Sequence, residues 1–123
     1  MRIPSFVATM HIKPTDCVLE IGCGHGIAAG IVCAMLTSGR YVGLDRSSKM
    51  IDAAIKRNAA HVRAGKARFI LGSLETASPR GPAFDKVFAM RVGIFETAPE
   101  QARRLALGWL AENGQLFVEY DRP

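Results

Sequence analysis

Cysteine pairs and long apolar runs are scarce in this chain of 123 residues, and so are aromatic residues, at 7%. The three cysteines are odd in number and form no C-x-x-C pair, which argues against a secreted disulfide framework. Cys23-x-His25 lacks the further ligands of a finger-like metal site, so no metal is predicted. The longest apolar stretch, residues 27–36, is too short to span a bilayer, and the amino terminus has no signal-peptide pattern. We therefore expect a cytoplasmic protein with no membrane segment.

Runs of basic residues are also absent, although the chain as a whole is basic. Sixteen Lys and Arg against eleven Asp and Glu give a net charge of +5. The basic residues are scattered, with no run of four and no interleaved aromatics, which favours solvated helix faces over a nucleic-acid surface. Hydrophobic residues make up 49% of the chain and charged residues 22%, as in ordinary globular proteins. Without repeats or linkers, residues 1–123 are predicted to form a single domain.

Five short apolar runs predict the strands of one sheet. They cover residues 17–21, 41–44, 68–71, 86–90 and 116–120. Most are nearly continuous apolar runs, which is typical of strands covered on both faces. Because segments of helical spacing alternate with them, we predict a three-layer α/β fold with a mainly parallel sheet. Residues 72–83 carry turn signals and are barely long enough for a parallel crossover.

The helices are predicted from apolar periodicity and from capping residues. One covers 26–38, and a single turn is expected within residues 5–10. A second helix, capped by Ser47 or Ser48, runs to Gly65, and its inward face is predicted to comprise Ile51, Ile55, Asn58 and Val62. A third starts at the capping box Thr97-x-x-Glu100 and continues through Trp109 and Leu110 to a stop at Gly114.

The strongest chemical signal is a glycine-rich loop between the first strand and the first full helix. It reads Glu20-Ile21-Gly22-Cys23-Gly24-His25-Gly26, and Asp45 follows nineteen residues later, at the end of the second strand. Ligands bind beyond the carboxyl ends of parallel strands, and an acid at this distance can accept hydrogen bonds from ribose hydroxyls. The third glycine comes one residue too early for the dinucleotide pattern G-x-G-x-x-G, and no P-loop Lys follows.

Residues 18–26 resemble motif I of the class I S-adenosylmethionine-dependent methyltransferases. Residues 43–50, 84–89 and 109–116 are similar to the stretches around their second, fourth and fifth strands. The resemblance covers about residues 14–121, nearly the whole chain. It implies a Rossmann-like, doubly wound sheet of five strands in the order 3-2-1-4-5, with S-adenosyl-L-methionine as the cofactor.

The same resemblance implies a cofactor site. Its eleven residues are Glu20, Gly22, Cys23, Gly24, Gly26, Asp45, Arg46, Met50, Ser73, Leu74 and Arg91. The glycines would line the methionine part, while Glu20 would orient its amino end or hydrogen-bond the loop backbone. Asp45 would bind the ribose, and Arg46 and Met50 would flank the adenine, unless Met50 belongs to the core. Ser73 stands where many members carry an Asp, and its hydroxyl can still accept from the adenine amino group.

The predicted activity is methyl transfer to a small-molecule acceptor. Glu96 or Asp121 could act as a base, but surface residues that play no part in catalysis are the simpler interpretation, so no catalytic residue is assigned. Family members continue past the fifth strand with a helix and a two-stranded hairpin, whereas this sequence stops at Pro123. A cofactor-binding domain without catalysis, or a remnant that needs a partner, is therefore the alternative. A nucleotide-dependent oxidoreductase is disfavoured by the early glycine.

An exposed sheet edge is the last expectation. Residues 116–120 would have an unpaired edge with apolar side chains, and such edges recruit other strands. We therefore expect a homodimer that buries this edge or the neighbouring Trp109 helix. The competing arrangement is a monomer in which residues 2–11 fold back as a cover.

Overall fold

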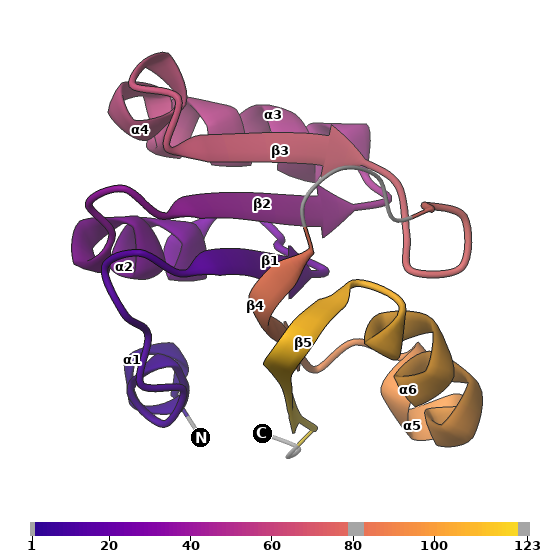
Figure 1. The fold of residues 1–123 in the computed structure, drawn as a ribbon. Coiled ribbons are helices and arrows are strands. Elements are labelled where there is room, and N and C mark those ends of the chain that lie inside the picture. Colours follow the sequence, from indigo (N-terminus) through magenta and orange to yellow (C-terminus); the bar gives the residue numbers. More distant parts are fainter. Residues whose placement is uncertain (1, 79–82, 121–123) are drawn as a thin grey trace.

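Five parallel strands form the centre of the molecule in the computed structural model, which describes residues 2–78 and 83–120 (Figure 1). The strands are β1 (Cys17–Ile21), β2 (Arg40–Asp45), β3 (Ala67–Leu71), β4 (Phe84–Met90) and β5 (Leu110–Glu119). Their order in the sheet is β3-β2-β1-β4-β5, and every pairing is parallel. This confirms the predicted order, and it brings the loops that follow β1, β2 and β4 to one edge of the sheet.

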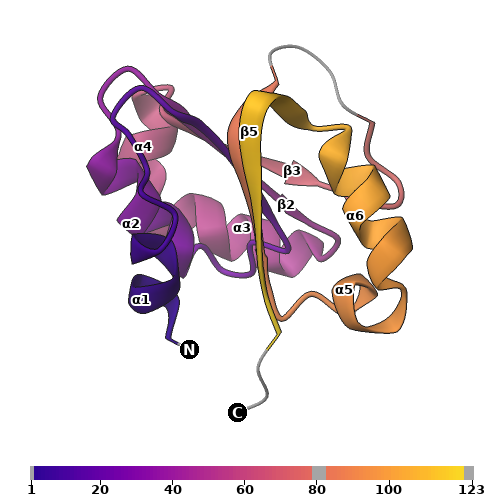
Figure 2. The same cartoon turned by 60° about the horizontal axis from the view of Figure 1, so that its bottom comes forward.

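Helices cover both faces of the sheet, which confirms the predicted three-layer architecture (Figure 2). They are α1 (Ile3–Ala8), α2 (Ile27–Met35), α3 (Ser48–Arg57), α4 (Ala59–Arg63), α5 (Ile94–Thr97) and α6 (Pro99–Leu107). The first four lie on one face, and α5 and α6 lie on the other. Among the described residues, no helix is long and apolar enough to cross a membrane.

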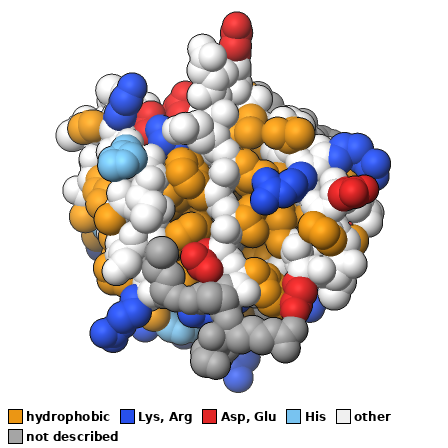
Figure 3. Space-filling view, turned by 90° about the horizontal axis from the view of Figure 1, so that it is seen from below, with side chains coloured by type: hydrophobic (Ala, Val, Ile, Leu, Met, Phe, Trp, Pro, Cys, Tyr) orange, Lys and Arg blue, Asp and Glu red, His pale blue; other side chains and the backbone are white. Residues whose placement is uncertain are grey.

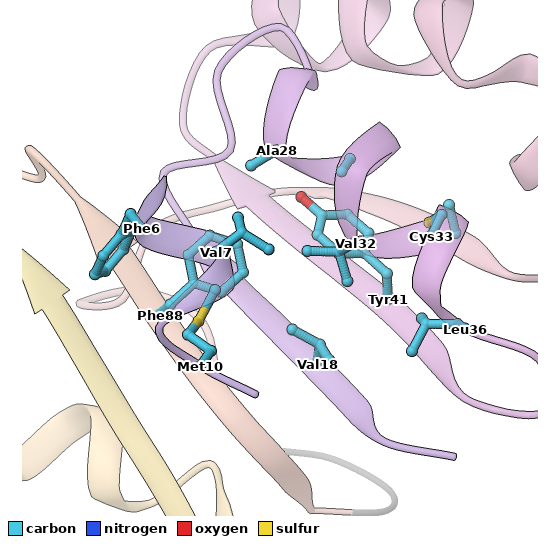
Figure 4. Packing of buried hydrophobic residues seen from close by; sticks show 12 residues of the cluster. Phe6, Val7, Met10, Val18, Ala28, Val32, Cys33, Leu36, Tyr41 and Phe88 are labelled. Atoms are coloured by element: carbon cyan, nitrogen blue, oxygen red, sulfur yellow. The ribbon is translucent and has the colours of Figure 1, made fainter. Parts of the chain in front are cut away.

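The short helix α1 packs against the sheet through apolar side chains. Its residues Phe6 and Val7, with Met10 just beyond, are almost completely buried. The rings of Phe6 and Phe88 lie edge to face with their centroids 6.2 Å apart, beside the residues of α2 (Figure 4). This packing places the amino-terminal segment close to the carboxyl end of β4, where the candidate site lies.

The predicted capping box at Thr97 and Glu100 is wrong. Helix α6 begins at Pro99, and no side chain caps it. A proline at the first helical position has its φ already fixed and lacks only an N–H that would have no partner there. The Thr97 hydroxyl instead donates to the carbonyl of Gly93 (3.2 Å), within the preceding short helix α5.

The predicted extension of this helix to Gly114 is also wrong. Helix α6 ends at Leu107, and the backbone N–H of Phe84 donates to the Trp109 carbonyl (2.9 Å), so pairing with β4 takes over there. Gly114 is not a helix stop but a point of close approach, since a Cβ there would lie 2.8 Å from the Phe84 carbonyl. Strand β5 is therefore longer than predicted and bulges opposite the start of β4.

The single helix predicted up to Gly65 is two helices that meet at Asn58. The backbone there departs from helical geometry, with φ −111° and ψ 29°. Ile51, Ala54 and Asn58 form the buried face, whereas Ile55, predicted to point inward, is 38% exposed. The apolar spacing indicated the helix correctly but could not show that a buried amide sits at its interruption.

Candidate active site

The glycine-rich loop joins β1 to α2 at the carboxyl edge of the sheet. Gly22, Gly24 and Gly26 all have positive φ, at 72°, 55° and 89°. Apart from its chain neighbours, no atom of the described residues would lie within 4 Å of a Cβ at Gly24. Glycine at this position is therefore required by its left-handed backbone and not by crowding. The space beside Gly24 is open in the described part of the chain.

Asp45, at the end of β2, holds the glycine loop through its carboxylate. Its Oδ2 accepts the backbone N–H of Gly24 (2.9 Å), and its Oδ1 accepts that of Ser47 (3.0 Å). Ser47 in turn caps α3 by accepting the N–H of Met50, which settles the choice between Ser47 and Ser48. One carboxylate thus joins the loop after β1 to the loop after β2, and each oxygen keeps a further lone pair for a ligand.

Glu20 is buried at the end of β1 and is bonded to a residue that the sequence did not single out. The Tyr41 hydroxyl donates to its Oε1 at 2.6 Å. Gly43, paired with Glu20 in the sheet, makes room for this contact, since a Cβ there would lie 2.7 Å from the Tyr41 hydroxyl. The pKa of Glu20 is raised from 4.5 to about 8, chiefly because the carboxyl is buried; the Tyr41 hydrogen bond lowers this pKa and the Asp45 charge raises it. Near neutral pH this carboxyl therefore carries a proton.

Cys23 is a buried thiol that stays protonated. Burial, followed by the negative charges of Glu20 and Asp45, raises its pKa to about 12. A nucleophilic cysteine needs the thiolate, so this environment supports a packing role within the loop. The part of the chain that the structure describes contains no group of three or more His, Cys, Asp or Glu residues able to hold a metal ion.

A hollow of about 260 Å³ opens beside Asp45 and brings together most of the predicted site residues. Its lining comes from the ends of β1, β2, β3 and β4: Ile21, Gly22, Asp45, Arg46, Gly72, Ser73, Leu74, Glu75, Met90, Arg91, Val92, Gly93 and Ile94. The loop after β3 is folded on itself, with the Ser73 hydroxyl 3.0 Å from that of Thr76. Four loops therefore surround one cavity, as expected for a nucleotide-like ligand at the edge of a doubly wound sheet.

A second hollow of about 170 Å³ lies on the other side of the glycine loop. It shares Gly22, Met90 and Arg91 with the first, so the two hollows adjoin. Ile3 and Phe6 of α1 form part of its wall, together with Glu20 and the loop residues up to His25. The two hollows together reach from Asp45, past the glycine loop, to the amino-terminal helix.

Some expected residues lie outside these hollows. Met50 is 36% exposed on α3 and is not part of either lining, nor is it core. Glu96, a candidate base, is exposed on α5, and its neighbour Phe95 is buried in the core. The other candidate base, Asp121, lies outside the described residues.

Two residues that shape the site were missed at the level of sequence. Tyr41 could have been found, because a tyrosine inside an otherwise apolar strand needs a hydrogen-bond partner for its hydroxyl. Asn58 was predicted only as part of a helix face, yet its side chain contacts the glycine loop. No spacing rule connects residues 26 and 58, so this contact became visible only in the fold.

Comparison with known proteins agrees with this geometry. Residues 18–114 match the family model described as a methyltransferase domain. The chain is 37% identical over 82 residues to the ribosomal protein L11 methyltransferase of Thermus thermophilus. This alignment covers 64% of this chain and 29% of that protein. It is 27% identical over 117 residues to the protein-L-isoaspartate O-methyltransferase of Methylorubrum populi, covering 95% of this chain and 50% of that one. The chain thus spans half or less of these curated relatives.

A solved structure shares the fold over almost the whole chain. It is a SAM-dependent methyltransferase from Thiobacillus denitrificans in complex with S-adenosyl-L-homocysteine. The TM-score is 0.79 at 18% identity, over 94% of this chain and 46% of that one. With a family model that matches most of its length and the glycine loop at the expected place, the chain belongs to the class I S-adenosylmethionine-dependent methyltransferases.

Proposed function

We propose that this chain binds S-adenosyl-L-methionine and transfers its methyl group to a small-molecule acceptor. The observation that carries the proposal is the Asp45 carboxylate, which fixes the glycine loop through Gly24 and at the same time lines the larger hollow. A site of this kind is preorganised, because the acid is already oriented by two backbone N–H groups before any ligand arrives.

The residues of the larger hollow fit an adenosine group. The remaining lone pairs of Asp45 would accept hydrogen bonds from both ribose hydroxyls. Arg46 and Leu74 would pack against the adenine, and the Ser73 hydroxyl would accept from the adenine amino group. A hydroxyl gives a weaker bond than a carboxylate would, by about 1 kcal/mol.

The residues around the glycine loop fit the amino-acid end. Gly22 and Gly24 carry no side chain that would block the loop's surface, and Glu20 lies behind the loop with an ionisable carboxyl. When bound, the cofactor would supply a methyl group from its positively charged sulfonium, and the sulfur would be left as a neutral thioether. Glu20 would lose its proton to meet the ammonium group. The surrounding residues orient the reactants and exclude water, which is the main demand of such a displacement.

The amino-acid end of the cofactor would occupy the glycine-loop side of the smaller hollow, next to Glu20. The opposite wall, from α1 and β4, is the proposed acceptor side, and it is largely apolar, with Ile3, Phe6 and Phe88. The L11 and isoaspartate methyltransferases are named for protein substrates, so a protein acceptor is the competing possibility.

Two measurements test the function. Calorimetric titration with S-adenosyl-L-homocysteine should show binding, while NAD and ATP should not bind. The chain is then incubated with methyl-labelled cofactor and, in separate reactions, with a small-molecule extract or a protein extract; label should be transferred to the small-molecule extract. Binding without transfer to either small molecules or protein would support the non-catalytic alternative. Failure to bind S-adenosyl-L-homocysteine would reject the proposal.

We further propose that the chain forms a homodimer in a reducing compartment such as the cytoplasm. Strand β5 pairs with β4 on one side only, among the described strands. Leu116, Phe117 and Val118 are only half-buried, and hydrophobic side chains flank a central band of backbone in the view from below (Figure 3). A second β5 would satisfy this edge. The odd number of cysteines, with no C-x-x-C pair, supports the reducing compartment.

A further inference from the structure

Asn58 is the one buried polar side chain of the described residues that reaches the glycine loop from a distant helix. Four polar or charged residues are buried in this part of the chain: Asp16, Glu20, Asn58 and Lys86. Asp16 and Lys86 bond to each other at the amino end of the sheet, and Glu20 bonds to Tyr41. Asn58 is only 3% exposed and lies where α3 ends and α4 begins.

The Asn58 amide ties the end of the loop to α3. Its Nδ2 donates to the carbonyl of Gly26 and to the carbonyl of Ala54, both at 3.0 Å. Among the described residues, the other donor to the Gly26 carbonyl is the N–H of Gly30 in the first turn of α2, at 3.4 Å. The amide therefore supplies the shorter hydrogen bond at the point where the loop becomes a helix.

Gly26 is shaped to receive this contact. Its φ is 89°, and a Cβ would lie 2.6 Å from Asn58 Nδ2 and 3.0 Å from the Ala54 Cα. The third glycine of the loop is thus required by close packing against α3 as well as by its backbone conformation. This separates it from Gly24, where a Cβ would meet open space.

The loop is consequently held from both ends of one helix. Asp45 precedes α3 and binds the Gly24 N–H, while Asn58 follows α3 and binds the Gly26 carbonyl. We propose that Asn58 is a positioning residue for the cofactor: it keeps the glycine loop in its binding conformation before the ligand arrives. The identity of the ligand rests on the proposed function, but Asn58 holds the loop whether or not a ligand is bound. Ordering the loop in advance removes an entropy cost from binding.

The test compares Asn58→Ala with Asn58→Ser, which keeps a donor on a shorter side chain, and with Asp16→Asn as a matched control. Asp16 is equally buried and bonded, but it lies at the opposite end of the sheet, where its Oδ2 accepts from Lys86 and from the Lys13 N–H. All three variants should lose global stability. Only the Asn58 variants should disturb the loop, and Asn58→Ser should do so less.

Amide hydrogen exchange of the ligand-free protein gives the first readout. The Gly24 and Gly26 amides should exchange about tenfold faster in Asn58→Ala than in the parent, and at the parental rate in Asp16→Asn. Titration with S-adenosyl-L-homocysteine gives the second, with affinity about tenfold weaker in Asn58→Ala and unchanged in Asp16→Asn.

Parental exchange rates in Asn58→Ala, or equal acceleration in Asp16→Asn, would overturn the proposal. If Asn58→Ala fails to fold, Asn58→Ser carries both readouts. If the parent protein does not bind S-adenosyl-L-homocysteine, the proposed function is wrong. The exchange rates of the ligand-free protein still decide whether Asn58 holds the loop.

Discussion

The Tyr41 hydroxyl lies 2.6 Å from Oε1 of Glu20, and both side chains are buried directly behind the glycine loop. The short bond joins the neighbouring strands β2 and β1. The Tyr41 side chain lies on the side of the sheet that faces α2 (Figure 4). Burial raises the pKa of Tyr41 well above its usual value of 10, and the nearby Glu20 raises it further, so the phenol remains the donor. The buried Glu20 carboxyl is therefore hydrogen-bonded but uncharged near neutral pH.

The first prediction concerns this bond. Tyr41→Phe should lower the free energy of unfolding by about 1–3 kcal/mol, because it leaves a buried carboxyl without its partner. Urea unfolding at pH 7 measures the loss. Tyr41→Phe combined with Glu20→Leu should recover part of it, since no unpaired polar group then remains. Parental stability in Tyr41→Phe would mean that the bond contributes nothing.

The second prediction is a pH dependence of binding. With a pKa of about 8, Glu20 is mostly protonated between pH 6 and 7.5 in the free protein. A ligand ammonium favours the ionised carboxylate, so binding releases a proton and strengthens as the pH rises. Affinity for S-adenosyl-L-homocysteine should increase by up to about tenfold per pH unit in this window. Calorimetry in buffers of different ionisation enthalpy should detect the released proton.

Glu20→Gln is the control for that effect. It keeps the shape and an acceptor for Tyr41 but cannot titrate, so its affinity should be weaker and nearly independent of pH over the same window. A parent protein whose affinity stays flat from pH 6 to 7.5 would show that Glu20 does not respond to the ligand.

The sheet could be predicted from the sequence because its strands carry their signals locally. Residues 17–21 were predicted with the observed bounds, and the alternation of apolar runs and helical segments indicated the layers. The end of α6 could not be predicted, because Trp109 continues the apolar period of the helix. Just past the helix, the Trp109 carbonyl accepts a hydrogen bond from Phe84, a residue twenty-five positions earlier, and local spacing carries no information on this contact.

The third prediction distinguishes two effects of a side chain at Gly24: strain in the loop backbone and obstruction of the proposed ligand space. Gly24 and Gly65 both have positive φ, at 55° and 75°, and a Cβ would meet no protein atom at either position. Gly24→Ala and Gly65→Ala should therefore each cost about 1–2 kcal/mol of stability. Only Gly24→Ala should also weaken binding of S-adenosyl-L-homocysteine, by at least about tenfold, because its methyl group enters the open space.

Thermal unfolding and calorimetry on the two variants decide this. Equal losses of affinity in both would attribute the effect to general destabilisation. Undiminished affinity in Gly24→Ala would place the ligand elsewhere.

The candidate site was predictable only in part, for the same reason as the fold. Asp45 was singled out because its distance from the glycine loop follows a recurring pattern of α/β folds. Its actual contact, with the Gly24 N–H, depends on how the loop turns back toward β2. Met50 was placed at the adenine by resemblance, but on α3 it lies one turn beyond the cap, with a third of its surface exposed.

The fourth prediction concerns Asp45 itself. Asp45→Ala removes the acceptor of two backbone N–H groups and of the proposed ribose bonds, so binding of S-adenosyl-L-homocysteine should weaken by roughly 3 kcal/mol or more. Asp52→Ala, which removes an exposed carboxylate from α3, should bind like the parent. The rise in melting temperature on adding the ligand measures both. If Asp45→Ala binds as well as the parent, the ribose assignment is wrong.

The fifth prediction concerns the edge of β5. Sedimentation at micromolar concentration should give a species of twice the 13.3 kDa chain mass. Phe117→Lys adds a charge to the half-buried row of this strand and should shift the species toward the monomer, because paired edges then bring like charges together. Leu107→Lys, at a position 59% exposed on α6, adds the same charge away from the edge and should leave the dimer intact. A parent protein that sediments only at 13.3 kDa, or a Leu107→Lys variant that dissociates as readily as Phe117→Lys, would contradict pairing through β5.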